Sequence, residues 1–251
     1  MNHCFVTCAL LIMVTLPAHA GQVVADLSQS NVSITSGFHG TELLLFGAID
    51  GQKDDDIIVV ITGPPTDIAQ HRKDNVGGIW INVETNIWTG APGLYQILAT
   101  QPLAKIADDQ TLKQLKIGAS KLQLQPLAAR SNEKLEATRV SALFEALVRS
   151  MEATGLWSSD VGLVELTDGA LFRANVVLPA NVISGEYDVK IFQFRDGIAL
   201  SQSETNLGVT KGGLSAAIYH FAHHHSLFYG LFAIAFAVAA GWLAAFAFRR
   251  S

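Results

Sequence analysis

The pattern of apolar and polar positions divides the chain into two apolar ends and a mixed middle. Residues 1–20 contain an apolar stretch, and Leu227–Phe248 is free of charged side chains. Between them, apolar residues alternate with polar ones or form short runs separated by turn residues, which is typical of β-strands. The pattern therefore predicts a β-rich domain between a hydrophobic leader and a hydrophobic helix.

Two apolar runs in the first part of the middle region predict a hairpin. Leu43–Phe46 and Ile57–Ile61 are continuously apolar, and the polar turn 50–56 lies between them. Continuous apolar runs indicate strands that are covered on both faces. We therefore expect these two strands to be neighbours in the sheet.

Further strands follow from alternation and from turn residues. Ile79–Val83 alternates, and the segments between residues 160 and 204 are separated by the pairs Asp168-Gly169 and Asp196-Gly197, which favour tight hairpins. Roughly eight or nine short strands at this spacing predict a mostly β protein, an immunoglobulin-like β-sandwich within residues 21–211.

A helical period interrupts the strands. Leu143, Phe144, Leu147 and Val148 share one face of a predicted helix that stops at Gly155. We therefore expect a helical insertion from about residue 103 to residue 155.

The two apolar ends predict how the chain is placed in a membrane. Residues 1–20 have the pattern of a signal peptide that is cleaved after Ala20; an uncleaved anchor is the alternative. As a helix, Leu227–Phe248 would be about 33 Å long, enough to cross the hydrocarbon core. Arg249 and Arg250 follow directly, and the positive-inside rule places them in the cytoplasm.

These signals predict a single-pass inner-membrane protein with a periplasmic N-terminal part and a cytoplasmic C-terminus. Its parts would be a signal peptide (1–20), a periplasmic domain (21–211), a juxtamembrane segment (212–226), a span (227–248) and a cytoplasmic tail (249–251).

Small residues recur every fourth position within the predicted span, at Ala233, Ala237, Gly241 and Ala245. Such a stripe allows two helix backbones to approach closely, so it predicts self-association or packing against another membrane helix. The alternative is that alanine is simply common in membrane helices.

Charge and cysteine content narrow the range of functions. Acidic residues outnumber basic ones between residues 26 and 211, and no basic stripe is visible, so a nucleic-acid partner is not expected. Both cysteines, Cys4 and Cys8, lie in the predicted signal peptide. The mature domain would therefore have no disulfide and no cysteine nucleophile.

Two groups of residues are candidate binding sites. His220, His223 and His224 would share one helix face and could bind zinc or copper. A pH-sensitive shoulder, or a plain polar shoulder at the membrane surface, is the alternative. Arg72 and Lys73 could bind an anion through charge-assisted hydrogen bonds, or could belong to a solvated loop.

A set of short stretches spread over the chain is specific when taken together. The stretches are 24–28, 35–42, 45–48, 58–64, 72–73, 78–82, 171–174, 194–197, 229–231 and 241–244. As a set they resemble an uncharacterised alphaproteobacterial family of transmembrane proteins that are anchored at the C-terminus. The resemblance implies this topology and no activity. It also associates the family with sulfite-exporter-type permeases, and so ranks such an integral membrane protein first among partners.

The sequence as a whole predicts a membrane-anchored periplasmic accessory or interaction module, associated with an inner-membrane transporter. The alternative is a periplasmic sensor that binds a ligand or a metal through the histidines or through Arg72 and Lys73. A hydrolase is the third hypothesis, but His39 and His71 are the only histidines that the globular part offers to a catalytic triad. No cofactor is predicted, because no phosphate-binding loop or dinucleotide fingerprint is present.

Overall fold

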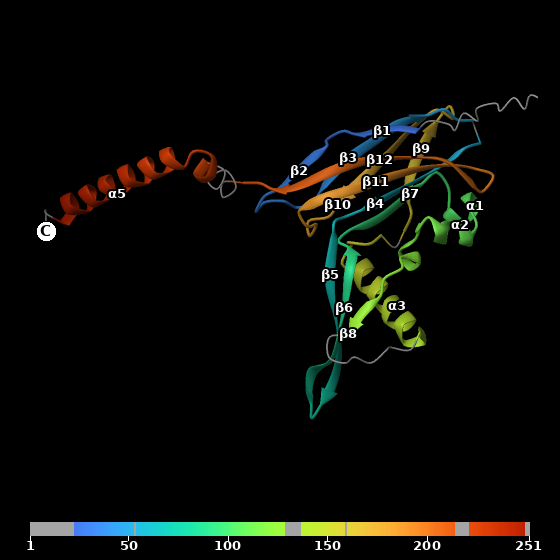
Figure 1. Ribbon diagram of the computed structural model, residues 1–251, viewed down its shortest axis with the longest axis horizontal. Helices are drawn as coiled ribbons and strands as arrows, with labels where there is room; N and C mark the ends of the chain where they lie inside the picture. Colours follow the sequence, from blue (N-terminus) through green and yellow to red (C-terminus); the bar gives the residue numbers. More distant parts are fainter. Residues whose placement is uncertain (1–22, 53, 129–136, 159, 214–220, 249–251) are drawn as a thin grey trace, which may run out of the picture.

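The computed structural model describes residues 23–52, 54–128, 137–158, 160–213 and 221–248 (Figure 1). Its strands are β1 (Val23–Leu27), β2 (Asn31–Ile34), β3 (Thr41–Ile49), β4 (Asp56–Thr62), β5 (Pro65–Val76), β6 (Ile79–Pro92), β7 (Tyr95–Ala99), β8 (Pro126–Ala128), β9 (Gly162–Thr167), β10 (Leu171–Leu178), β11 (Gly185–Arg195) and β12 (Ile198–Lys211). Its helices are α1 (Leu103–Ile106), α2 (Asp109–Gln114), the 3-10 helix η1 (Ala119–Lys121), α3 (Ala137–Ala153) and α5 (Ser226–Phe248).

Nine strands form one large sheet in the order β1-β3-β10-β9-β7-β4-β11-β12-β2. Neighbouring strands are antiparallel except for the parallel pairs β7–β9 and β12–β2. Although β1 and β12 lie near opposite ends of this order, they are in contact, so the sheet folds over on itself. Its two halves, β1-β3-β10-β9 and β7-β4-β11-β12-β2, enclose a hydrophobic core.

Alternating side chains fill this first core. Along β10, Phe172, Ala174, Val176 and Leu178 are buried while the residues between them are exposed. Tyr187, Val189 and Ile191 of β11 belong to the same core. The Asp-Gly pairs form the predicted turns, because Asp168, Gly169, Asp196 and Gly197 all have positive φ and connect paired strands.

A second core covers the outer face of β7, β4 and β11. It joins sheet residues such as Ile58, Val60 and Phe192 to Ile106, Leu112, Ile117, Leu147 and Met151 of the helical segment. The predicted helical insertion is therefore confirmed, as is the mostly β class with one apolar C-terminal helix. The immunoglobulin-like arrangement stays a prediction.

The predicted hairpin of residues 43–46 with residues 57–61 is wrong. β3 pairs with β1 and β10, whereas β4 pairs with β11 and β7. The run in β4 is buried on both faces, between the two cores, as expected. β3 has one exposed face instead, with Leu44 and Phe46 pointing outward. An apolar run shows how a strand is covered, but not which strand lies beside it.

β5 and β6 form a long hairpin that projects from the large sheet (Figure 1). We call this hairpin, Pro65–Pro92, the arm. The glycines at its turn, Gly77 and Gly78, have φ of 65° and 87°, which suits a tight two-residue hairpin turn. β8 adds a third strand only beside Asn86–Trp88.

α5 lies apart from both sheets (Figure 1). The segment Ser226–Phe246 is long and apolar enough to cross a membrane, and none of its most apolar window is buried against the rest of the chain. The predicted signal peptide, its cleavage after Ala20, and the predicted cytoplasmic residues 249–251 lie outside the described residues.

Candidate interaction surfaces

The base of the arm is held against α3. Trp88 is fully buried, its ring centroid lies 5.7 Å from that of Phe144, and its Nε1 donates to Gln70 Oε1 at 3.0 Å. Gln70 Nε2 donates in turn to the backbone oxygen of Leu143 at 3.0 Å. Both strands of the arm are therefore fixed to the helix at this level.

Ionic contacts continue this support one step further along the arm. Glu84 accepts hydrogen bonds from Asn86, from Arg72 Nε at 3.2 Å and from Arg139 of α3 at 2.8 Å. These contacts, the one from Asn86 first, hold the pKa of Glu84 below its usual range. The carboxylate therefore stays ionised between two arginines.

The predicted anion site at Arg72 and Lys73 lies in strand β5 of the arm, not in a loop. Arg72 bonds to Glu84 and also lies 3.8 Å from Asp74. Lys73 is opposite Asn82 on β6. The guanidinium thus already faces two carboxylates, and anion binding at these residues stays a prediction.

Beyond this support, the end of the arm is apolar and exposed. We call Val76, Ile79, Trp80, Ile81 and Val83 the apolar tip; their exposed fractions are 56%, 67%, 67%, 44% and 38%. Among the described residues no third strand pairs with this part of the arm. A two-stranded ribbon gains little stability alone. These five side chains therefore contribute little to the stability of the fold.

A second exposed apolar surface lies on the outer side of the half-sheet β1-β3-β10-β9. We call it the open face and define it by Val24, Leu44, Phe46, Leu163, Leu171 and Val177, which are between 40% and 65% exposed. Near its middle Arg173 Nε donates to Glu165 at 2.7 Å, and Arg173 is opposite Phe46. No described helix covers this face, in contrast to the outer face of β4 and β11.

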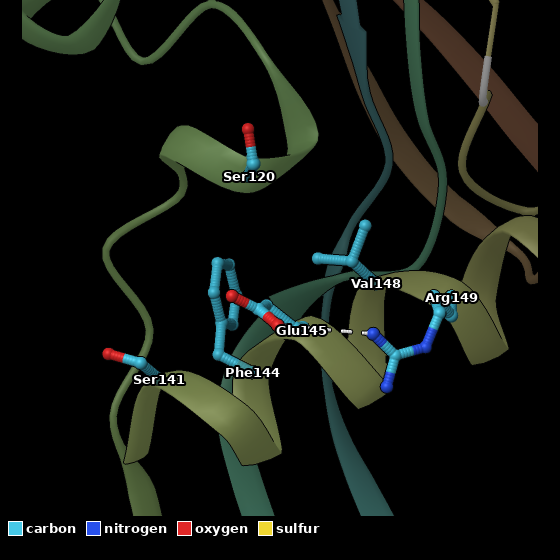
Figure 2. A pocket seen from close by; sticks show the side chains of 6 residues that line it. All are labelled: Ser120, Ser141, Phe144, Glu145, Val148 and Arg149. Atoms are coloured by element: carbon cyan, nitrogen blue, oxygen red, sulfur yellow. Dashed lines mark ion pairs between the residues drawn. The ribbon is translucent and has the colours of Figure 1, made fainter. Parts of the chain in front are cut away.

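A groove of about 410 Å³ lies between η1 and α3. Figure 2 shows the six side chains that line it. Phe144 and Val148 form its apolar part, and Glu145 and Arg149 form an ion pair of 4.0 Å along one side. Its two serine hydroxyls, Ser120 and Ser141, come from different elements (Figure 2). The described lining of the groove contains no histidine.

A cleft of about 310 Å³ lies between the large sheet, the base of the arm and the loop after α2. At its edge Tyr95 donates to the backbone oxygen of Lys116 at 2.8 Å and accepts from Gly118 N at 2.9 Å. Burial raises the pKa of Tyr95 to about 12. Its hydroxyl therefore stays protonated at neutral pH and fixes the loop.

A buried polar cluster at the other end of β4 is structural. Asp55, whose side chain is fully buried, accepts from Arg195 Nε at 2.5 Å, from Gln193 Nε2 at 2.7 Å and from Gln52 N at 2.9 Å. The hydrogen bond from Arg195 holds the pKa of Asp55 below its usual value. The cluster ties the 50–56 turn to β11.

The predicted metal site is only partly within the described residues. His223 and His224 lie in the helical residues 221–224, and His220 lies outside the described residues. Within the described part of the chain, no group of three or more His, Cys, Asp or Glu side chains could hold a metal ion. The three-histidine site stays a prediction.

The structure shows where the globular histidines and the small-residue stripe lie, but it does not test the roles predicted for them. His39 Nδ1 lies 2.7 Å from the backbone oxygen of Gly37, and His71 Nδ1 lies 2.9 Å from Thr85 Oγ1. The four stripe residues Ala233, Ala237, Gly241 and Ala245 are all exposed on α5. Helix packing through them stays a prediction.

Sequence reasoning missed both apolar surfaces. The arm had a usable signal, since Gly77-Gly78 before the alternating Ile79–Val83 is a hairpin signature. The open face had none, because which side of β3 is covered depends on where the helical insertion packs.

A comparison with protein families shows which family the chain matches. Residues 22–250 match the model of a family described as "Putative transmembrane protein (Alph_Pro_TM)". This match confirms the resemblance that the sequence motifs indicated. No curated protein matches the chain.

Proposed function

Since the chain belongs to this family of transmembrane proteins, we propose that it is a membrane-anchored accessory module whose open face binds an integral membrane protein. The observation that carries the proposal is the contrast between the two outer sides of one sheet. The insertion covers the outer side of β4 and β11, whereas six large apolar side chains stay exposed on β1, β3, β10 and β9.

The composition of the open face supports a protein partner. Apolar side chains alternate there with Asp26, Glu165 and Arg173 on antiparallel strands. Non-obligate protein interfaces have this mixed character, with apolar contacts among paired polar groups. Burying one of the half-exposed leucine or phenylalanine side chains would contribute about 1 kcal/mol.

The membrane anchor supports a partner that is itself in the membrane. α5 keeps the module beside other membrane proteins, and the stripe of Ala233, Ala237, Gly241 and Ala245 would give a second contact within the bilayer. We place the globular part in the periplasm and Arg249 and Arg250 in the cytoplasm, following the signal peptide and the positive-inside rule. An inner-membrane transporter, first a sulfite-exporter-type permease, is the partner to test.

The test is affinity purification of the full-length protein in mild detergent with mass spectrometry of what co-purifies. We expect a multi-spanning membrane protein in stoichiometric amount with the wild type. The double variant Phe46→Ser/Leu171→Ser should lose it, because the open face becomes polar.

The matched control is Ile198→Ser, since Ile198 is 65% exposed but lies outside the open face. This variant should keep the partner. A wild-type protein that purifies alone, or a double variant that retains the partner in full, would contradict the proposal.

A further inference from the structure

We infer that the apolar tip of the arm inserts into the lipid bilayer that α5 crosses, and so gives the protein a second membrane contact. The inference goes beyond the proposed function, because it concerns different residues and a lipid partner. It rests on where the arm leaves the sheet, on its length and on the chemistry of its end.

The arm and the chain that leads from Lys211 to α5, which we call the tether, leave the large sheet at the same end. β4 ends at Thr62, which pairs with Asp188, and the arm begins three residues later at Pro65. Gly185, which packs against Pro64, pairs with Val209 near the end of β12. The chain therefore starts the arm and starts toward α5 from neighbouring positions.

The arm is long enough to reach the bilayer. From Lys211 to Phe221, where the described chain resumes, a fully extended chain spans at most about 35 Å. β5 has 12 residues, which corresponds to about 40 Å from the sheet to the turn. The tether thus cannot hold the sheet further from the start of the helical segment than the arm can extend.

The end of the arm has the chemistry of an interfacial membrane contact. The end of the ribbon from Asn75 to Trp80 has no charged residue, and Asp74 is opposite Ile81, so insertion as far as the Asn75–Trp80 pair desolvates no ion. Trp80 and its apolar neighbours suit the headgroup boundary, where tryptophan is enriched. Lys73, which comes directly before Asp74 on β5, would then lie close enough to the membrane surface to meet lipid phosphates.

The narrow, two-stranded shape of the tip limits how deep it goes. The outer backbone groups of the ribbon would lose their water in the hydrocarbon core, which is costly. Insertion therefore stops at the interface, roughly 5–10 Å deep, as for amphipathic segments. A protruding apolar end fits a deformable lipid surface without requiring a matching groove.

The test measures the depth of Trp80 in the full-length protein reconstituted in phosphatidylcholine vesicles with brominated acyl chains. The background variant is Trp242→Phe, which removes the tryptophan of α5. Trp88 and Trp157 are 0% and 1% exposed in the folded body, so Trp80 is the tryptophan open to quenching. We expect its emission to fall about twofold relative to vesicles of unbrominated lipid.

Two variants make this result specific. Trp80→Phe in the same background should abolish the quenching, and Ile79→Ser/Ile81→Ser should reduce it while circular dichroism shows an unchanged fold. If the emission with Trp80 present is no more quenched than without it, the inference is overturned. If a photo-reactive residue at position 80 instead cross-links to a second copy of the protein in these vesicles, the inference is overturned as well.

Failure of this inference and failure of the proposed function can be told apart. The vesicles contain only this protein, so the quenching does not depend on any protein partner. Partner capture depends on Phe46 and Leu171 and should persist in the Trp80→Phe variant. A Trp80→Phe variant that loses the co-purifying protein would show that the tip binds protein, against the lipid assignment.

Discussion

Phe192 and Phe46 both point outward from the large sheet, but their surroundings differ. Phe192 on β11 is 4% exposed beneath the helical insertion, whereas Phe46 on β3 is 44% exposed on the open face. The same chain thus covers one outer side of its sheet with helices and leaves the other uncovered. The covered side stabilises the fold, and we assign the open face to binding.

The arm repeats this contrast within a single strand. Trp88 of β6 is buried between Gln70 and Phe144, while Trp80, eight residues earlier, is 67% exposed. Contiguous exposed apolar patches of this kind mark sites that interact with a protein or a membrane. The difference teaches that the apolar residues of this protein must be divided by environment before a role is assigned.

The largest expected effect is on the covered phenylalanine. Phe192→Ala should lower the free energy of unfolding by about 3–5 kcal/mol, because it leaves a cavity between the sheet and the insertion. Phe46→Ala should cost less than about 1 kcal/mol, since water already reaches its ring. Urea titration of the full-length protein in detergent, followed by tryptophan emission, measures both. Equal losses would remove the distinction between the two faces.

The buried carboxylate gives the next effect. Asp55→Ala should lower the free energy of unfolding by about 3 kcal/mol, because it leaves Gln193 and Arg195 without their acceptor. The loss stays at the low end of the range for broken buried pairs, since the Arg195 side chain is 31% exposed. The same titration measures it.

The pH dependence of this pair has a fixed sign. The pKa of Asp55 is lower in the folded protein, so its stabilisation is present above about pH 4 and is lost as the pH falls through the folded value. Wild type should therefore lose more stability than Asp55→Asn on acidification below pH 4. A parallel pH profile for the two proteins would show that Asp55 is not the group responsible.

A smaller effect is expected at the cleft. Tyr95→Phe removes the hydroxyl that bonds to Lys116 and Gly118, which should cost about 1–2 kcal/mol. The aromatic ring stays in place against Trp157, so the second core should remain intact. If the variant instead loses as much stability as Phe192→Ala, the hydroxyl organises more of the insertion than these two bonds.

Sequence reasoning was most successful where a local rule fixes the structure. The Asp-Gly turns, the helical period of α3 and the apolar helix α5 each depend on a few neighbouring residues. The pairing of β3 and β4 failed because strand partners are chosen by long-range packing. β5 was missed because its polar sequence, Gln70 to Asn75, shows no alternation when both faces of the ribbon meet water. The open face required knowledge of where the insertion packs.

The smallest expected effect on stability is at the open face itself. Leu171→Ser should change the free energy of unfolding by no more than about 0.5 kcal/mol, because Leu171 is 60% exposed. The urea titration that measures Phe192→Ala also measures this variant. A loss of several kcal/mol would show that the open face is part of the fold and not a free surface.

The most direct test of the binding assignment is the accessibility of the open face in native membranes. A single cysteine replaces Leu171 in a chain carrying Cys4→Ser and Cys8→Ser, and Ile198→Cys serves as the control. A bound partner excludes water from the face, so we predict maleimide labelling of Leu171→Cys about tenfold slower in native membranes than in the purified protein, with no change for Ile198→Cys. Equal labelling rates at Leu171→Cys in both states would contradict the account.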